Sequence, residues 1–266
     1  MNHKLVLLTI GTFLLLILIS FPFLAEIDPK QPNLDEVLNS PSHLHPFGTD
    51  VYGRDVFVRT LLGTQRSLIM SLMALGIACV GGIILGILSQ IGEPLLDFAI
   101  ASFLDVFLSI PAVLVALVIV AVTVRSPVSA AIAVGIALVP GMGRVARGAL
   151  MSKQVEPYVE SIRALGAGRM RLLWRHVLPN SQRQISSFAG TTFVWALLDL
   201  AALDFLGLSG SPSTITLGRL IADGRLVIRT APWATIFPSV FLLSLILVVI
   251  GWSDISEYVD SGSTRT

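Results

Sequence analysis

Apolar residues gather along this chain in long runs that short polar stretches separate. Six runs are long enough to cross a bilayer, because a spanning helix needs about 20 largely apolar residues. Their approximate bounds are Leu5–Leu24, Ser67–Ser89, Phe98–Val124, Val128–Leu150, Ile185–Leu206 and Ala234–Trp252. The pattern predicts an all-α membrane protein with six transmembrane helices.

The first run resembles a signal peptide in one respect, since Lys4 precedes it. However, the run is longer than a usual signal-peptide core, and the residues around Ala25 offer no small-x-small cleavage site. We therefore interpret Leu5–Leu24 as a retained membrane anchor.

Composition supports the bilayer as the solvent of this chain. Of 266 residues, 54% are hydrophobic and 13% are charged, whereas soluble domains carry about 25% charged residues. The net charge of +1 gives no reason to expect a nucleic acid as partner. The sole cysteine, Cys79, lies inside an apolar run, which excludes a disulfide framework and a clustered thiolate metal site.

Basic residues predict the orientation of the helices, because they concentrate in cytoplasmic loops. The segment 144–183 holds eight basic and two acidic residues, whereas the loop 25–66 holds four basic and six acidic ones. We therefore place the loop between the fourth and fifth helices in the cytoplasm. Six spans then place both termini in the cytoplasm as well, with 25–66 and 208–233 outside.

The cytoplasmic loop carries an amphipathic pattern of its own. Pro157 suits the first turn of a helix that Gly166 and Gly168 end. A second short helix is predicted from Arg169, with Pro179 as its terminator. The apolar stripes are Tyr158, Ile162 and Leu165 on the first helix and Met170, Leu173, Trp174 and Val177 on the second. A solvated loop whose arginines fix the topology and a docking element for a partner protein both remain open.

This loop resembles the EAA loop of ABC-transporter permeases, whose pattern is Glu-Ala-Ala, three residues, Gly, nine residues and Ile-x-Leu-Pro. Glu160, Gly166, Leu178 and Pro179 match that pattern at full spacing. In the family the loop is a coupling helix that fits a cleft of the ATP-hydrolysing subunit. The resemblance implies an ATPase-coupling set made of Tyr158, Glu160, Ile162, Arg163, Ala164, Gly166, Ala167, Leu178 and Pro179.

The resemblance narrows to the dipeptide, oligopeptide and nickel branch, and to its C-type permease. The stretch GTDVYGRD at 48–55 is similar to the motif that precedes the second helix in that branch. The stretches at 104–117, 199–210, 222–225 and 231–239 are similar to the same branch. The implied fold is that of a type I ABC importer permease with the EAA loop between helices four and five.

The residues around GTDVYGRD also allow a structural interpretation. We expect Asp50 to cap an interfacial helix that carries Phe57 and Leu61, and Asp55 to pair with Arg59 one turn later. The stretch lacks the carboxylate density of a calcium loop and the lysine of a phosphate loop. It is therefore predicted to be an interfacial turn that leads into the second span.

Four residues inside the predicted spans are candidates for the translocation path: Asp105, Pro111, Asp199 and Asp204. Carboxylates are costly in a bilayer and usually face the bundle interior or water. A structural pairing or helix-end role is the alternative for Asp105 and Asp199. Asp204 stands where the branch usually has glycine, and presenting negative charge to a cationic cargo is the less favoured of its interpretations.

Two histidines in the outer loop, His43 and His45, have ligand chemistry that suits nickel. Histidines in such a loop are more often plain polar residues, so no metal site is predicted. The chain contains no phosphate-binding loop motif and no nucleophile–base motif. We therefore expect no enzymatic activity and no bound cofactor, with ATP and Mg²⁺ on partner subunits.

The predicted organisation has three parts. Residues 1–66 form the anchor helix and outer loop, 67–256 the permease core with its EAA loop at about 153–180, and 257–266 a cytoplasmic tail. The resemblance implies an ATP-driven importer in the inner membrane of a prokaryote, moving peptides or nickel and metal chelates. Its partners would be a second homologous permease, two ATP-binding subunits and an extracytoplasmic binding protein. An ion-coupled secondary transporter or channel is the alternative.

Overall fold

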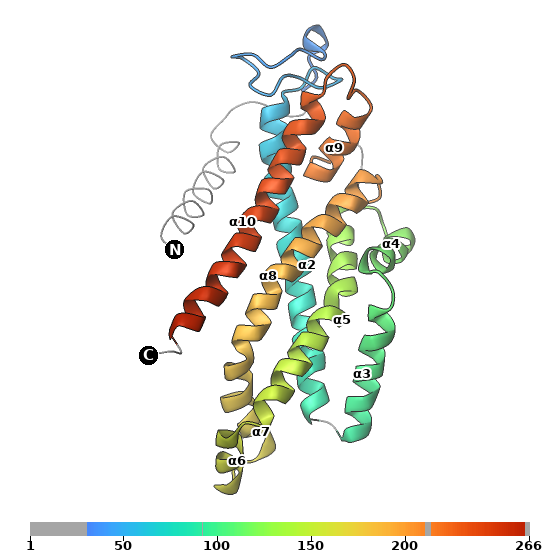
Figure 1. The fold of residues 1–266 in the computed structure, drawn as a ribbon. Coiled ribbons are helices and arrows are strands. Elements are labelled where there is room, and N and C mark those ends of the chain that lie inside the picture. Colours follow the sequence, from blue (N-terminus) through green and yellow to red (C-terminus); the bar gives the residue numbers. More distant parts are fainter. Residues whose placement is uncertain (1–30, 92, 211–213, 264–266) are drawn as a thin grey trace.

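A computed structural model describes residues 31–91, 93–210 and 214–263, and these are almost entirely helical (Figure 1). Within these ranges the only β pairing is one isolated bridge between Thr49 and Asp55. The elements are η2 (Leu34–Glu36), α2 (Val56–Ile91), α3 (Pro94–Leu108), α4 (Ala112–Val122), α5 (Pro127–Gln154), α6 (Pro157–Ala164), α7 (Arg169–Leu172), η3 (Leu173–Val177), α8 (Leu178–Phe205), α9 (Leu217–Arg225) and α10 (Trp233–Ser263).

Four helical stretches are long and apolar enough to cross a membrane: Val56–Ile91, Pro127–Gln154, Arg169–Phe205 and Trp233–Trp252. They confirm four of the predicted spans. The expected anchor Leu5–Leu24 lies outside the described residues. The second span is longer than predicted, because the interfacial helix expected to carry Phe57 and Leu61 forms the first turns of α2 itself.

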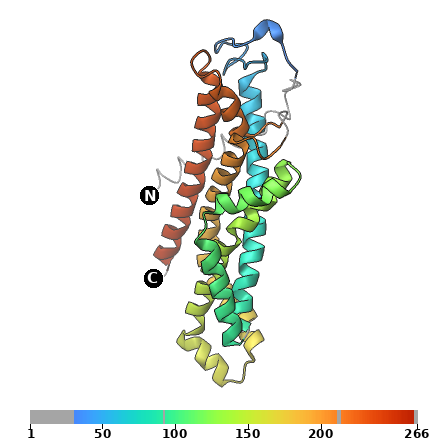
Figure 2. The ribbon, with the colours of Figure 1, turned by 90° about the vertical axis from the view of Figure 1, so that its right-hand side faces the viewer.

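The third predicted span, Phe98–Val124, is wrong as a single helix. The chain bends by 87° between α3 and α4. Pro111 causes the break, because proline donates no backbone N–H and disfavours helical geometry at the residue before it. The 11 residues of α4 rise only about 16 Å, which is too short to cross a hydrocarbon core of about 30 Å. Figure 2 shows α4 lying across the long helices.

Small residues let α2 and α5 pack closely. A Cβ atom added at Gly82 would lie 2.6 Å from the Cβ of Met142, and one added at Gly86 would lie 2.8 Å from the Cβ of Ala146. Membrane helices associate through such small residues, because van der Waals contact replaces the hydrophobic effect in lipid.

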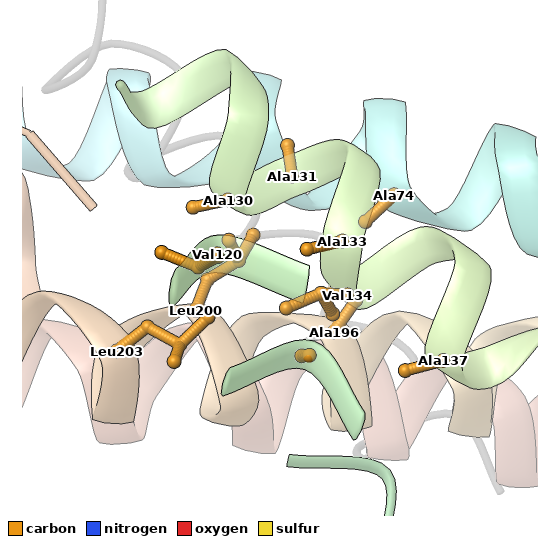
Figure 3. Close-up of a cluster of buried hydrophobic side chains, with 11 residues drawn as sticks. Ala74, Val120, Ala130, Ala131, Ala133, Val134, Ala137, Ala196, Leu200 and Leu203 are labelled. Atoms are coloured by element: carbon orange, nitrogen blue, oxygen red, sulfur yellow. The ribbon is translucent and has the colours of Figure 1, made fainter. Parts of the chain in front are cut away.

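The same principle governs the bundle centre, where alanines from α2, α5 and α8 meet larger side chains (Figure 3). The buried residues are Ala74, Ala116, Val120, Ala130, Ala131, Ala133, Val134, Ala137, Ala196, Leu200 and Leu203. Val120 brings the end of α4 into this cluster, so the short helix is anchored although it does not span.

We predict that Gly82→Ala destabilises the protein, because the new methyl group would overlap Met142. Overpacking of this kind costs about 1–3 kcal/mol. The matched control is Gly76→Ala on the same helix, where an added Cβ meets nothing within 4 Å. Thermal unfolding in detergent should show a lower Tm for Gly82→Ala and an unchanged or higher Tm for Gly76→Ala. Equal Tm values for the two variants would contradict the packing account.

Candidate functional site

A helical elbow that follows α5 and runs into the start of α8 contains all of the residues that the EAA pattern selects. The name elbow is used here for residues 156–180. Pro157 stands in the first turn of α6, and α6 ends at Ala164, as the sequence predicted. Gly166 follows with φ of +85°, a conformation that costs other residues about 1–2 kcal/mol. The Gly166 N–H donates to the Arg163 carbonyl at 3.0 Å, which closes the turn.

The second half of the elbow differs from the prediction. The helix expected to end at Pro179 does not end there, because α7, η3 and α8 form one continuous helix, Arg169–Phe205. Pro179 lies in the first turn of α8. The Pro179 ring would clash with a backbone carbonyl of a normal preceding α-helical turn, and Pro179 has no N–H to donate. The preceding turn is therefore wider and forms the π-helical segment η3. There the Leu178 N–H donates to the carbonyl of Leu173.

One apolar face of the elbow is buried against the long helices. Val159, Leu173 and Val177 pack against Ile87 of α2 and Leu150 of α5, and all five are at most 9% exposed. Tyr158, Ile162 and Leu178 lie at the edge of this cluster. The sequence analysis missed Val159, which lies beside the predicted stripe rather than in it.

A second apolar face of the elbow points outward. Leu165 is 87% exposed, Met170 48% and Trp174 54%. The predicted stripes therefore mix two surfaces, one that holds the elbow to the bundle and one that is available to a partner. Met170 and Trp174 lie four residues apart on the continuous helix Arg169–Phe205, and exposed large apolar side chains that are neighbours can mark an interaction surface.

The coupling candidates divide between these surfaces. Glu160, Arg163, Ala164, Gly166 and Pro179 are exposed. Ala167 is half-buried, and Tyr158 accepts a hydrogen bond on its hydroxyl from Asn180 at 3.1 Å, which joins α6 to the start of α8. The structure brings these residues together at one end of the molecule (Figure 1), and their contact with an ATPase stays a prediction.

The pathway candidates do not form one group. Asp105 of α3 forms an ion pair with Arg144 of α5, which is the structural role left open by the sequence. A parallel pair joins Asp97 to Arg147 through two contacts of 2.7 Å. Pro111 is the N-cap residue directly before α4. The two ion pairs fasten α3 to α5.

Asp199 and Asp204 lie farther along α8. Asp199 is half-buried, and its Oδ2 forms no hydrogen bond within the described residues. Asp204 is 7% exposed, with Thr216 as a hydrogen-bond partner and Arg219 as a nearby cation. Gly218 of α9 packs directly over it, since an added Cβ would lie 2.7 Å from the Asp204 Cβ. In this conformation Asp204 faces α9, and its contact with cargo stays a prediction.

The loop 31–55 uses its charges differently from the prediction. Asp55, not Asp50, caps α2 by accepting from the Val58 N–H at 3.0 Å. The expected Asp55–Arg59 pair is wrong, since Arg59 contacts Asp50 at 3.4 Å. Asp55 instead contacts the His45 Nδ1 at 2.7 Å. Asp50 organises the turn before the helix by accepting from two backbone N–H groups.

His45 joins two parts of this loop to the start of α2. Its Nε2 lies 3.1 Å from Glu36 and its Nδ1 2.7 Å from Asp55, whereas His43 is exposed. The hydrogen bond with Asp55 and the nearby Glu36 raise the pKa of His45 despite its partial burial. Across the described residues, no three His, Cys, Asp or Glu side chains are arranged to hold a metal ion.

Comparisons with known proteins place this architecture among transport subunits. Residues 79–257 match the family model described as the binding-protein-dependent transport system inner membrane component. A dipeptide transport system permease protein of Alkalihalophilus pseudofirmus is 35% identical over 94% of this chain and 81% of its own length. A glutathione transport system permease protein of Pectobacterium atrosepticum is 32% identical over 90% of this chain and 80% of its own length.

Solved structures show the same fold. The MetNI methionine ABC transporter in an inward-facing conformation contains a chain that matches with a TM-score of 0.64 at 20% identity, over 77% of this chain and 96% of that one. An amino acid ABC transporter matches with a TM-score of 0.62 at 15% identity, over 75% of this chain and 93% of that one. The fold is therefore that of ABC importer permeases.

We predict that the loop 31–55 is held most firmly at low pH. The pKa of His45 is raised in the folded state, so protonated His45 stabilises the folded loop. This stabilisation is fully present below the unfolded pKa of about 6.5 and is lost as the pH rises through the folded-state pKa. Amide hydrogen exchange over residues 33–50, corrected for the intrinsic rate, should be slower at about pH 5.5 than at about pH 8.5.

The variants His45→Gln and His43→Gln test that assignment. His45→Gln should lose the pH dependence, and His43→Gln, which changes an exposed histidine two residues away, should keep it. Equal corrected exchange at both pH values in the wild type would show that His45 does not hold the loop.

Proposed function

Because the chain belongs to the family of binding-protein-dependent transport system inner membrane components, we propose that it is one of two permease subunits in an ATP-driven importer of small peptides. Relatives at 35% and 32% identity are named as dipeptide and glutathione permeases, which favours a peptide over a nickel chelate as cargo. The partners we propose are a second permease, two ATP-binding subunits that hold ATP and Mg²⁺, and an extracytoplasmic binding protein.

The observation that carries this proposal is the two-faced elbow. Its inner face is fixed to α2 and α5, while Leu165, Met170 and Trp174 are exposed on the outside. A docking element needs both properties, because it must bind a partner and must transmit the partner's movement. The continuous helix Arg169–Phe205 extends about 55 Å, so a displacement at the elbow would reach the far end of α8.

The proposed transport requires one orientation of this chain in the membrane. The eight basic residues between 144 and 183 support placing the elbow in the cytoplasm, where ATP is available. Both termini would then lie on the same side, and the loop 31–55 would face the binding protein. Closure of the ATP-binding subunits would move the two elbows and switch the pathway between outward and inward access. This chain itself would carry out no covalent step.

We predict that Leu165→Glu prevents the ATP-binding subunit from docking, because a carboxylate would replace an 87% exposed apolar contact. Co-purification of that subunit should fall by at least about tenfold, which corresponds to 1.4 kcal/mol. The control is Leu226→Glu, at a residue that is 78% exposed between α9 and α10 at the opposite end of the molecule. If the ATP-binding subunit co-purified normally with the Leu165→Glu variant, the elbow would not be part of the docking surface.

We predict further that Glu160→Lys and Gly166→Pro each stop peptide uptake while the protein remains inserted in the membrane. Proline is excluded at Gly166 because its ring fixes φ near −65°, whereas Gly166 has φ of +85°. Uptake into proteoliposomes and ATP hydrolysis should be measured together. Normal uptake by both variants would show that the elbow does not couple the two processes, and uptake driven by a proton gradient without ATP would favour a secondary transporter.

The cargo is identified by isolating the importer with its binding protein and analysing the bound ligand by mass spectrometry. A pool of short peptides is the expected result. A nickel or cobalt chelate would show that the transport class is right and the proposed cargo is wrong.

A further inference from the structure

Two exposed arginines, Arg171 and Arg175, lie on the second half of the elbow. Neither side chain forms a hydrogen bond or an ion pair with any residue that the structure describes. The two residues are four positions apart on the continuous helix Arg169–Phe205, so they are neighbours on one side of that helix. They are called the arginine pair below.

The arginine pair lies beside the outward apolar residues of the elbow. Arg171 directly follows Met170, and Arg175 directly follows Trp174. One residue turns a helix by about 100°, so the two arginines form a row next to the row of Met170 and Trp174, which are 48% and 54% exposed. The elbow therefore presents an apolar row and a cationic row side by side.

Nearby acidic residues do not balance this charge. Residues 156–180 contain four arginines and two glutamates, and Glu156 already contacts the Nζ of Lys153 at 2.6 Å. Basic residues also fix membrane topology, but that effect depends on their number in a loop and not on their position beside apolar side chains. An exposed cationic row beside exposed apolar residues favours an acidic partner surface.

The distance from the membrane argues for a protein as this partner. The apolar run of the helix begins at Ile185. At 1.5 Å per residue, Arg175 lies about 15 Å and Arg171 about 21 Å before that run. The headgroup layer on each side of the hydrocarbon core is only about 5–8 Å thick. In the proposed orientation the arginine pair therefore lies beyond the lipid headgroups, on the cytoplasmic side.

We propose that the ATP-binding subunit presents to this surface a groove with an apolar floor and an acidic rim. Met170 and Trp174 enter the floor, and the arginine pair contacts carboxylates of the rim, which guanidinium groups bind through two parallel hydrogen bonds. The inference rests on the proposed docking of an ATP-binding subunit at the elbow and adds the chemistry of the docking groove. Rim charges act mainly on the rate of association, and salt screens them.

The test measures how fast the ATP-binding subunits associate with the full-length permease pair in phosphatidylcholine nanodiscs. This lipid has no net charge, so the membrane surface does not attract or repel the subunits. Surface plasmon resonance should show that the wild type associates at least about tenfold faster in about 50 mM than in about 500 mM KCl.

Double variants assign this salt dependence to the arginine pair. Arg171→Gln with Arg175→Gln should slow association about tenfold at the lower salt concentration and leave it nearly unchanged at the higher one. Arg171→Lys with Arg175→Lys keeps the charge and should retain most of the rate. The matched control is Arg225→Gln with Arg229→Gln, which removes two exposed arginines with the same spacing at the opposite end of the molecule (Figure 1) and should behave as the wild type.

The lysine variant also identifies the contact itself. A carbodiimide joins a lysine amine to a carboxylate as an amide and does not join arginine in this way. Mass spectrometry of the treated importer should find the lysine introduced at position 171 or 175 linked to an aspartate or glutamate of the ATP-binding subunit. The absence of such a link from the assembled complex would overturn the inference.

The remaining outcomes separate the acidic rim from its alternatives. Association of the wild type that does not depend on salt, or a glutamine double variant that is as fast as the wild type at low salt, would overturn the inference. Loss of co-purifying phosphatidylglycerol from that variant, with unchanged association, would assign the arginine pair to lipid headgroups instead. If Leu165→Glu prevents docking but the wild type shows no salt dependence, only the acidic rim is wrong. If the ATP-binding subunits do not bind the wild-type permease, the proposed function and this inference are both wrong.

Discussion

The apolar contact between the elbow and the ends of α2 and α5 is the interaction on which this structure depends. Val159, Leu173 and Val177 are buried there against Ile87 and Leu150. Without this contact a docked partner would move only a flexible loop. With it, the elbow and α8 form one lever, because the helix continues from Arg169 to Phe205 and the π-helical segment absorbs Pro179 without a break.

The proposed lever would move against a scaffold that α5 organises. Glycines and alanines bring α5 close to α2, and the ion pairs of Asp97 with Arg147 and of Asp105 with Arg144 connect it to α3. The break at Pro111 turns α4 across the bundle, where Val120 joins the central cluster.

Hydrophobic runs were sufficient to predict four of the long helices, since burial in lipid requires about 20 apolar residues whatever their packing. Runs could not reveal that Phe98–Val124 is broken, because the segments on both sides of Pro111 are apolar enough to read as one run. The glycine turn at 166 was predictable from residue type alone. The continuation through Pro179 was not, because it depends on whether the preceding turn can widen.

The ion pairs show the same limit of what the sequence can predict. Helical spacing predicted Asp55 with Arg59, but the fold brings His45 and Asp50 from the preceding loop into contact with these residues. Likewise, periodicity located the apolar residues of the elbow but did not separate Val159, which is buried, from Leu165, which is exposed. Contacts between distant segments of the chain decide which charges pair and which apolar residues are buried. The spacing of residues within one helix carries no information about those contacts.

The most direct measurement is the distance between spin labels at Met170→Cys and Leu198→Cys, two exposed positions on the continuous helix, after replacement of Cys79 by serine. In the assembled importer this distance should stay near 42 Å with and without ATP, while the distance from Met170→Cys to a label at Leu243→Cys on α10 changes. A 170–198 distance that shifts by more than about 5 Å, roughly one helical turn, would show that the helix bends at the elbow and would contradict the lever.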